Sequence, residues 1–406
     1  MKRILGVFAV ILVFSAFVFS LGFSVQPFFS TVNEGDSKYL IYQVTPVIDL
    51  DFFKIGLGVN TYQTEIGGDF YFGYPVAGIP DSTNIINGVA LNFVEFDFDS
   101  IGAKYGFMDN YTFGLGTVLY RYSVPMSKAV DLRLGSKDGL NIQAHIPFEV
   151  SKWYPFEYRQ SASAMWASTK LPVGPFSVSA LGGTNMLSAA ENTDYFGNAG
   201  AYMNLLAGLS VGGEAGVIMT QIATDSTFGY LAGAGAIWDL GMIRLRSLPV
   251  ILISPEAVLG YVDWDYESGD NYAKLLSEED TRFGGLTEFV FDFNDLVSAS
   301  ARYSYDIKGS FESLQNQKIN ADFSFNSPFE EYPFIINGMY RRNISDGNTI
   351  LELKDGLFDS NTKAELVVSY PILEGLNVSY ITYFDKIESG DPVFGNKVEF
   401  GAAYSF

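Results

Sequence analysis

Charged side chains at every second position are the residues of this chain best suited to act on solutes. Glu95, Asp97 and Asp99 follow one another in that spacing, and five later segments carry charged residues two or four positions apart or singly. Side chains two residues apart share one face of a β-strand, so each set predicts a charged stripe. Stripes on facing walls of an enclosed sheet would filter polar or ionic solutes. The candidate lining residues are Glu95, Asp97, Asp99, Glu288, Asp292, Arg302, Asp306, Lys318, Asp322, Arg341, Lys363 and Glu365.

The overall charge indicates which solutes such a lining would prefer. Asp and Glu number 46 against 25 Lys and Arg, which gives a net charge of −21. This acidic excess favours cations over anions. A simpler interpretation also stays open, in which the charged residues only keep an interior wet and select nothing. The same charge argues against a nucleic-acid partner, because phosphate binding needs a cationic surface.

Catalytic and metal-binding chemistry has little support. The chain has no Cys and a single His, His145, so disulfides, thiolate metal sites and multi-His metal sites are excluded. The acidic residues Asp263, Asp265, Glu267 and Asp270 depart from the spacing of a calcium loop, so we expect a solvated loop there. The sequence therefore predicts no enzyme activity, no metal and no cofactor.

The first residues have the composition of an export signal. Lys2 and Arg3 precede an almost wholly apolar stretch over residues 4–19, and small residues follow at Ser20 and Ser24. This order is typical of a secretory signal peptide, here residues 1–24, cleaved after Ser20 or Ser24. The alternative is an uncleaved anchor helix, since the apolar stretch approaches the length of a membrane span.

The remaining residues, 25–406, show the period of strands rather than helices. Apolar and polar residues alternate in blocks of about ten, as in residues 140–150, 297–306 and 318–326. Short and long connections also alternate along the C-terminal half, which predicts turns on one side and long loops on the other. Residues 195–238 are rich in Gly and Ala, and their structure stays open. The Pro- and Gly-containing residues 74–87 are a candidate constriction or an ordinary surface loop.

The C-terminus has the most specific pattern. Val398, Phe400, Ala402, Tyr404 and Phe406 form an apolar stripe that ends on the last residue. A final strand ending in Tyr-x-Phe resembles the C-terminal assembly signal of bacterial outer-membrane β-barrels. The mature chain is similar in kind to the porin-like barrels of that group, and its style resembles those of toga-bearing thermophiles.

That resemblance implies an all-β fold: one closed antiparallel transmembrane β-barrel of about 20 strands, within a range of about 16 to 22. It implies a barrel-assembly machinery and outer-membrane lipid as partners, passive diffusion of small solutes or ions, and often a trimer. We therefore expect an outer-membrane porin with weak cation selectivity. The alternatives are a substrate-specific channel or transporter, a non-conducting barrel that anchors a surface layer, and a soluble secreted β-sandwich.

Overall fold

The computed structural model describes most of the chain after residue 21. The described residues are 22–34, 37–50, 52–64, 68–73, 83–108, 110–123, 128–136, 139–147, 162–185, 192–206, 208–222, 225–252, 257–263, 266–268, 282–294, 296–308, 314–329, 333–344, 358, 362–373, 376–386, 392–402 and 404–405. Among them, no helix is long and apolar enough to cross a bilayer.

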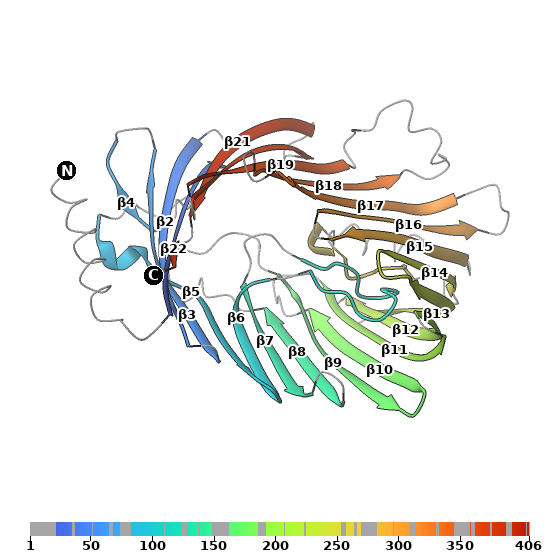
Figure 1. Ribbon diagram of the computed structural model, residues 1–406. Coiled ribbons are helices and arrows are strands. Elements are labelled where there is room, and N and C mark those ends of the chain that lie inside the picture. Colours follow the sequence, from blue (N-terminus) through green and yellow to red (C-terminus); the bar gives the residue numbers. More distant parts are fainter. Residues whose placement is uncertain are drawn as a thin grey trace.

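The described residues form one antiparallel sheet (Figure 1). Its strands are β1 (Gly22–Glu34), β2 (Ser37–Asp49), β3 (Phe53–Gln63), β4 (Tyr71–Phe72), β5 (Val89–Phe98), β6 (Ile101–Phe107), β7 (Lys128–Gly135), β8 (Asn141–Pro147), β9 (Ala164–Val173), β10 (Phe176–Asn185), β11 (Asn192–Leu206), β12 (Leu209–Ile222), β13 (Asp225–Asp239), β14 (Ile243–Leu252), β15 (Arg282–Phe293), β16 (Val297–Lys308), β17 (Leu314–Asn326), β18 (Ile335–Ile344), β19 (Thr362–Leu373), β20 (Leu376–Lys386), β21 (Pro392–Ala402) and β22 (Tyr404–Ser405). Two short 3₁₀ turns, η1 (Ile85–Gly88) and η3 (Tyr266–Ser268), lie in the connections.

The sheet closes on itself. Each long strand pairs with its neighbour in sequence, and β1 pairs with both β21 and β22 across the seam. β22 extends β21 along the same edge, and β4 pairs only with β3. The wall is therefore a barrel of 20 antiparallel strands within the described residues, which confirms the predicted fold and strand number. A single closed sheet rules out the sandwich alternative.

The predicted alternation of connection lengths holds in part: residues 223–224 form a short link at the long-loop end, and 309–313 there are fewer than 327–334 at the other end. Asp99 and Ser100 link β5 to β6, and two residues, 174–175, link β9 to β10. At the opposite end, residues 64–88, 108–127 and 253–281 separate consecutive long strands. The Gly/Ala-rich residues 195–238 are also wall, because they form most of β11, β12 and β13. β5 contains a bulge, where Gly56 pairs with Phe93 and Leu57 pairs with Leu91.

The outer face of the barrel is apolar. Cross-strand partners share a face, so the residues that contact the interior fix the orientation of every strand. Aromatic side chains lie exposed on the outer face toward both ends of the strands. Tyr195, Phe228, Tyr230 and Phe283 lie toward the long loops, and Phe98, Phe176, Trp238, Phe293 and Phe323 lie toward the short turns. Two such rows are typical of a barrel whose ends meet two membrane interfaces.

Most of the C-terminal apolar stripe lies on two strands, β21 and β22. β21 pairs with β20 along its length, and Tyr404 and Ser405 pair with Val25 and Ser24 of β1. The stripe residues Val398, Phe400, Ala402 and Tyr404 therefore lie on strands at the seam, while Phe406 lies outside the described residues.

Candidate functional site

A segment between β6 and β7 lies inside the barrel instead of beyond its rim. Figure 1 shows this segment within the ring of strands. Residues 110–123, here called the crossing segment, contact the wall at β7 near their own base and reach β15, β16 and β17 on the far side. Leu115, Thr117 and Val118 at its centre are almost fully buried. The crossing segment therefore divides the lumen at the depth where it runs between β7 and β16.

A single wall carboxylate holds the middle of the crossing segment. Glu214 of β12 accepts hydrogen bonds from the backbone N–H of Leu115 at 2.5 Å and from the Thr117 hydroxyl at 2.6 Å. Asn198 and Tyr202 of β11 donate to the same carboxylate. Four donors compensate the burial of Glu214, which is 4% exposed, and they fix its orientation.

A second inner segment, residues 257–263 and 266–268, lies between the crossing segment and the wall. A parallel bridge between Leu119 and Val262 joins the two segments. Tyr261 and Tyr266 each donate to Asp194 of β11 at 2.8 Å. The inward faces of β9 to β15 supply apolar partners, so a close-packed core fills this side of the barrel. Its members include Leu115, Val118, Leu119, Trp166, Leu181, Phe196, Ile218, Leu231, Val250, Val258, Val262 and Leu286.

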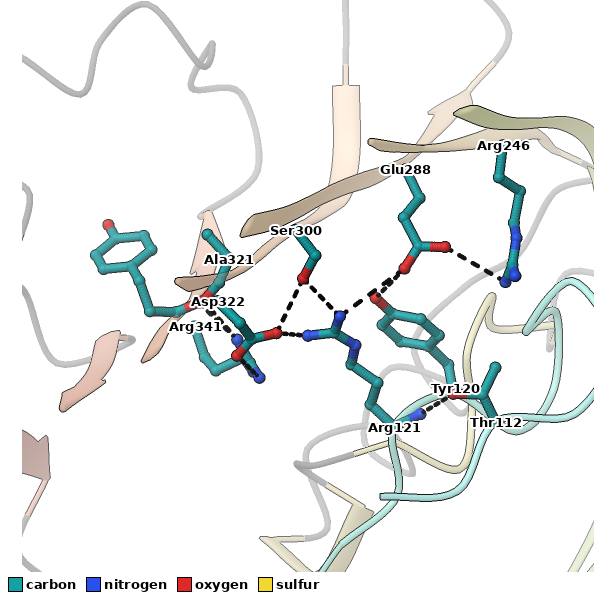
Figure 2. Close-up of polar contacts among 10 residues, drawn as sticks. Thr112, Tyr120, Arg121, Arg246, Glu288, Ser300, Ala321, Asp322 and Arg341 are labelled. Atoms are coloured by element: carbon teal, nitrogen blue, oxygen red, sulfur yellow. Dashed lines mark hydrogen bonds and ion pairs between the residues drawn. The ribbon is translucent and has the colours of Figure 1, made fainter. Parts of the chain in front are cut away.

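The C-terminal part of the crossing segment, Tyr120 and Arg121, contacts a network of guanidinium and carboxylate groups (Figure 2). Arg121 forms an ion pair with Asp322 of β17 and donates to Ser300 of β16 at 2.7 Å. Arg341 of β18 donates to the other oxygen of Asp322 at 2.5 Å and to the Ala321 carbonyl at 2.8 Å. Asp322 thus lies between two arginines, one from the segment and one from the wall.

Tyr120 links the same part of the crossing segment to a second carboxylate. Its hydroxyl donates to Glu288 of β15 at 3.3 Å, and Arg246 of β14 pairs with Glu288 at 3.4 Å. The guanidinium of Arg302 lies 3.3 Å from the Tyr120 ring centroid and donates to the Gly116 carbonyl at 3.0 Å. Burial raises the pKa of the Tyr120 phenol, so this hydroxyl stays protonated and keeps donating.

The base of the crossing segment is fixed by Asp131 of β7. Tyr111 donates to one oxygen of Asp131 at 2.6 Å, and Nδ1 of His145 lies 2.7 Å from the other. The His145 ring stacks on Trp166 with the centroids 4.0 Å apart. Nε2 of His145 is buried and has no hydrogen-bond partner among the described residues. The single imidazole of the chain therefore supports the inner segment.

Tyr122 connects the two inner segments through Glu267. Its hydroxyl donates to Glu267 at 2.6 Å, and the backbone N–H of Ser163 donates to the same oxygen at 2.8 Å. Burial raises the pKa of the Tyr122 phenol well above its ordinary value, and the Glu267 charge raises it further. Burial and Asp194 act in the same direction on Tyr266. Both phenols therefore remain donors over the ordinary pH range.

The structure brings several predicted lining residues to one inner face. Register pairs Glu288 with Arg302, Arg302 with Asn320, Asn320 with Arg341 and Arg341 with Lys363, so these side chains point inward together. Asp322 and Glu365 both pair with Met339 and share that face. Glu95 and Asp97 lie inward on β5, where Arg133 pairs with Asp97 at 2.6 Å. Asp292 lies on the same face at the short-turn end of β15.

Other predicted residues have different surroundings. Asp99 lies in the two-residue turn after β5, so the prediction that it continues the strand face is wrong. Arg302, Asp306 and Lys318 point inward but are 3%, 1% and 3% exposed, because the inner segments cover them. Lys318 pairs with Asp263, so the expectation of a fully solvated acidic loop is wrong at that residue. Asp265 and Asp270 lie outside the described residues.

Sequence reasoning missed the crossing segment itself. The candidate constriction, residues 74–87, lies mostly outside the described residues. Its last three residues belong to η1. One signal was available, because Leu115, Val118 and Leu119 are too apolar for a connection exposed to water. Glu214 was a second signal, as a carboxylate within a Gly/Ala-rich stretch. Nothing in the sequence paired these two segments with each other.

The Gly114→Ala variant should displace the crossing segment. Gly114 has φ +57°, which L side chains rarely adopt, and an added Cβ would overlap Glu214 and Tyr202. We expect a lower unfolding temperature in detergent and an altered single-channel current. Gly182→Ala is the matched control, because a Cβ at Gly182 meets nothing within 4 Å. Equal behaviour of the two variants would contradict this account of the segment.

Comparison with known proteins finds similarity only among solved structures. No family model and no curated protein matches the chain. The outer membrane protein opdK from Pseudomonas aeruginosa is 9% identical with a TM-score of 0.38, over 95% of this chain and 98% of that chain. A BenF-like porin from Pseudomonas fluorescens is 9% identical with a TM-score of 0.37, over the same shares of the two chains. The fold assignment rests on the strand register itself.

Proposed function

We propose that the protein is a channel for small hydrophilic solutes in a bacterial outer membrane. The observation that carries this proposal is the closed 20-stranded wall, apolar outside and charged on much of its inner face. Within lipid, every backbone polar group must be paired inside the protein, and a closed sheet meets that condition. A wall of this size has room for water in its lumen.

The same wall supports the cellular location. Aromatic side chains exposed on the outer face near both strand ends suit two membrane interfaces, and the apolar belt between them suits lipid. An export signal at the N-terminus agrees with this location. We propose cleavage after Ser20, because Gly22 and Ser24 pair within the wall with Asp49 and Ser405. Lipid, the assembly machinery and a trimeric state remain expectations from the resemblance.

Planar-bilayer recording of the purified mature protein tests the function directly. Stable open steps would support a pore, and a salt gradient would give the sign of its charge selectivity. A folded barrel that passes no current would contradict the channel and favour the surface-layer anchor.

The predicted cation preference has one supporting and one opposing observation. The acidic excess of the chain supports it, as do Glu95 and Asp97 on the inner face of β5. Beside Tyr120 and Arg121, however, Arg121, Arg246 and Arg341 pair with Glu288 or Asp322, and Arg302 lies opposite Glu288 in the register. We propose that the carboxylates of the wide part of the lumen set a weak cation preference. The arginines then reduce it at the narrow level.

Neutralising Glu95, Asp97 and Asp99 together should move the reversal potential toward anions. Glu95 and Asp97 project into the lumen near the short turns, while Asp99 lies in the turn itself. The control restores Asp99 alone in the triple variant. Restoring Asp99 should change the reversal potential less than restoring Glu95 or Asp97. An unchanged reversal potential in the triple variant would contradict the assignment.

A solute-specific channel is the second candidate function. The observation that favours it is the crossing segment, whose hydrogen bonds to β7, β12 and β16 define a fixed inner surface. Such a surface can discriminate between solutes of different shape and charge. Concentration-dependent block of the ionic current by one class of solute would support this candidate, and its absence across sugars, carboxylates and amines would oppose it.

A further inference from the structure

The lumen is unequally divided by the two inner segments, which together are here called the inner partition. We propose that solutes cross this level of the barrel on one side only, between the partition and the inward faces of β17 to β20 and β5 to β7. This inference rests on the proposed channel function and adds the route to it.

The other side is closed by protein. Inward side chains of β9 to β15 such as Leu181, Ile218 and Leu231 are 5%, 0% and 1% exposed. They pack against Val118 and Val262 of the partition within one hydrophobic core. Cores packed at this density contain no continuous path for water, and an apolar lining disfavours ions further. Solutes therefore cannot pass between the partition and this part of the wall.

The join between the partition and the wall is closed as well. At one edge, Arg121 bonds to both Ser300 and Asp322, which bridges β16 and β17. At the other edge, Tyr111 bonds to Asp131, which lies opposite His145 on β8. These polar contacts join the partition to the wall at both edges within the described residues.

On the remaining side of the lumen, inward side chains stay partly exposed and most of them are polar. Met339, Lys363 and Glu365 of β18 and β19 point inward and are only half-buried. On β5 the inward side chain of Asp97 retains 56% exposure although it pairs with Arg133. Inward side chains that remain exposed within a closed wall are in contact with lumenal water. The route therefore runs beside these residues, with Arg121 at the edge of the partition.

The reactivity of introduced cysteines tests this route. The unmodified chain contributes no background reaction, since it has no Cys. Met339→Cys places a thiol on the open side, next to Asp322 in the register. Ile218→Cys and Ser179→Cys place thiols on the inward face of the closed side, where both residues are buried. Each variant would be recorded in a planar bilayer before and after a positively charged methanethiosulfonate reagent. Ser179→Cys keeps the test valid if Ile218→Cys does not fold.

The expected result is a stepwise loss of current in Met339→Cys and no change in the two closed-side variants. Loss of current in a folded closed-side variant, or an unaffected Met339→Cys, would overturn the proposed route. Absence of current in the unmodified protein would instead contradict the channel function, so the two failures are distinguishable. Mass spectrometry of the modified protein shows whether each thiol reacted, so an unreactive Met339→Cys also counts against the route.

Discussion

Replacing Glu214 with alanine is expected to release the crossing segment and to raise both the conductance and the current noise. The variant leaves the Leu115 N–H and the Thr117 hydroxyl without their charged acceptor inside a buried region. A hydrogen bond to a charged group contributes about 1.5–3 kcal/mol, so the loss of these two weakens the docking by about 3 kcal/mol or more. Asn198 and Tyr202 lose the same partner.

The matched control is Glu95→Ala. It removes one inward carboxylate of the wall without touching the crossing segment, so it separates the change of lumenal charge from the loss of docking. Single-channel recording at symmetric high salt is the measurement, because screening then minimises the charge effect. If Glu214→Ala conducts like Glu95→Ala, the role of Glu214 in holding the segment is wrong.

Replacing Asp306 with alanine is expected to cause the largest loss of stability. Asp306 pairs with Arg282 at 2.6 Å, and the side chains are 2% and 0% exposed. Arg282 also donates to the Ala257 carbonyl, where the second inner segment begins. Removing one partner of a buried pair typically costs about 3–5 kcal/mol. Unfolding in urea, followed by tyrosine and tryptophan fluorescence in detergent, measures the change.

The loss of stability in Asp306→Ala can come from the buried charge of Arg282 or from lost packing. The double variant Arg282→Met with Asp306→Leu separates these two contributions. Apolar residues of similar volume often replace a buried ion pair with little loss of stability. We expect the double variant to be more stable than Asp306→Ala alone. A double variant that is less stable would show that the pair acts mainly through its contact with Ala257.

Periodicity and the termini were enough to predict the wall, but not its contents. Alternation in segments such as 297–306 indicated the strand period directly. The face of charged residues inside the strands was also predictable, as for Glu288 and Arg341, because a strand has only two faces. Asp99 was misplaced because it lies beyond the end of its strand. Residues 195–238 resisted prediction because glycine and alanine provide weak contrast between those faces.

The charged site was predictable residue by residue but not as an arrangement. Arg302 and Asp322 were identified as inward-facing, yet their contacts come from Tyr120 and Arg121 of the connection between β6 and β7, far from β16 and β17 along the chain. Such contacts depend on the path of a loop, which local periodicity does not encode. For the same reason, the sequence predicted that Asp306 and Lys318 contact lumenal water, whereas the inner segments cover both residues.

The hydrophobic core inside the wall constrains the order of folding. Leu115 bonds to Glu214 across 99 positions of sequence, and Arg302 reaches Gly116 across 186 positions. Contacts this remote form late, because the entropy of closing such loops must be overcome first. The crossing segment can be held only after β12 and β16 have both taken their places in the wall. The nascent barrel therefore encloses an unanchored segment before its core condenses, so maturation of the lumen follows closure of the wall as a separate kinetic step.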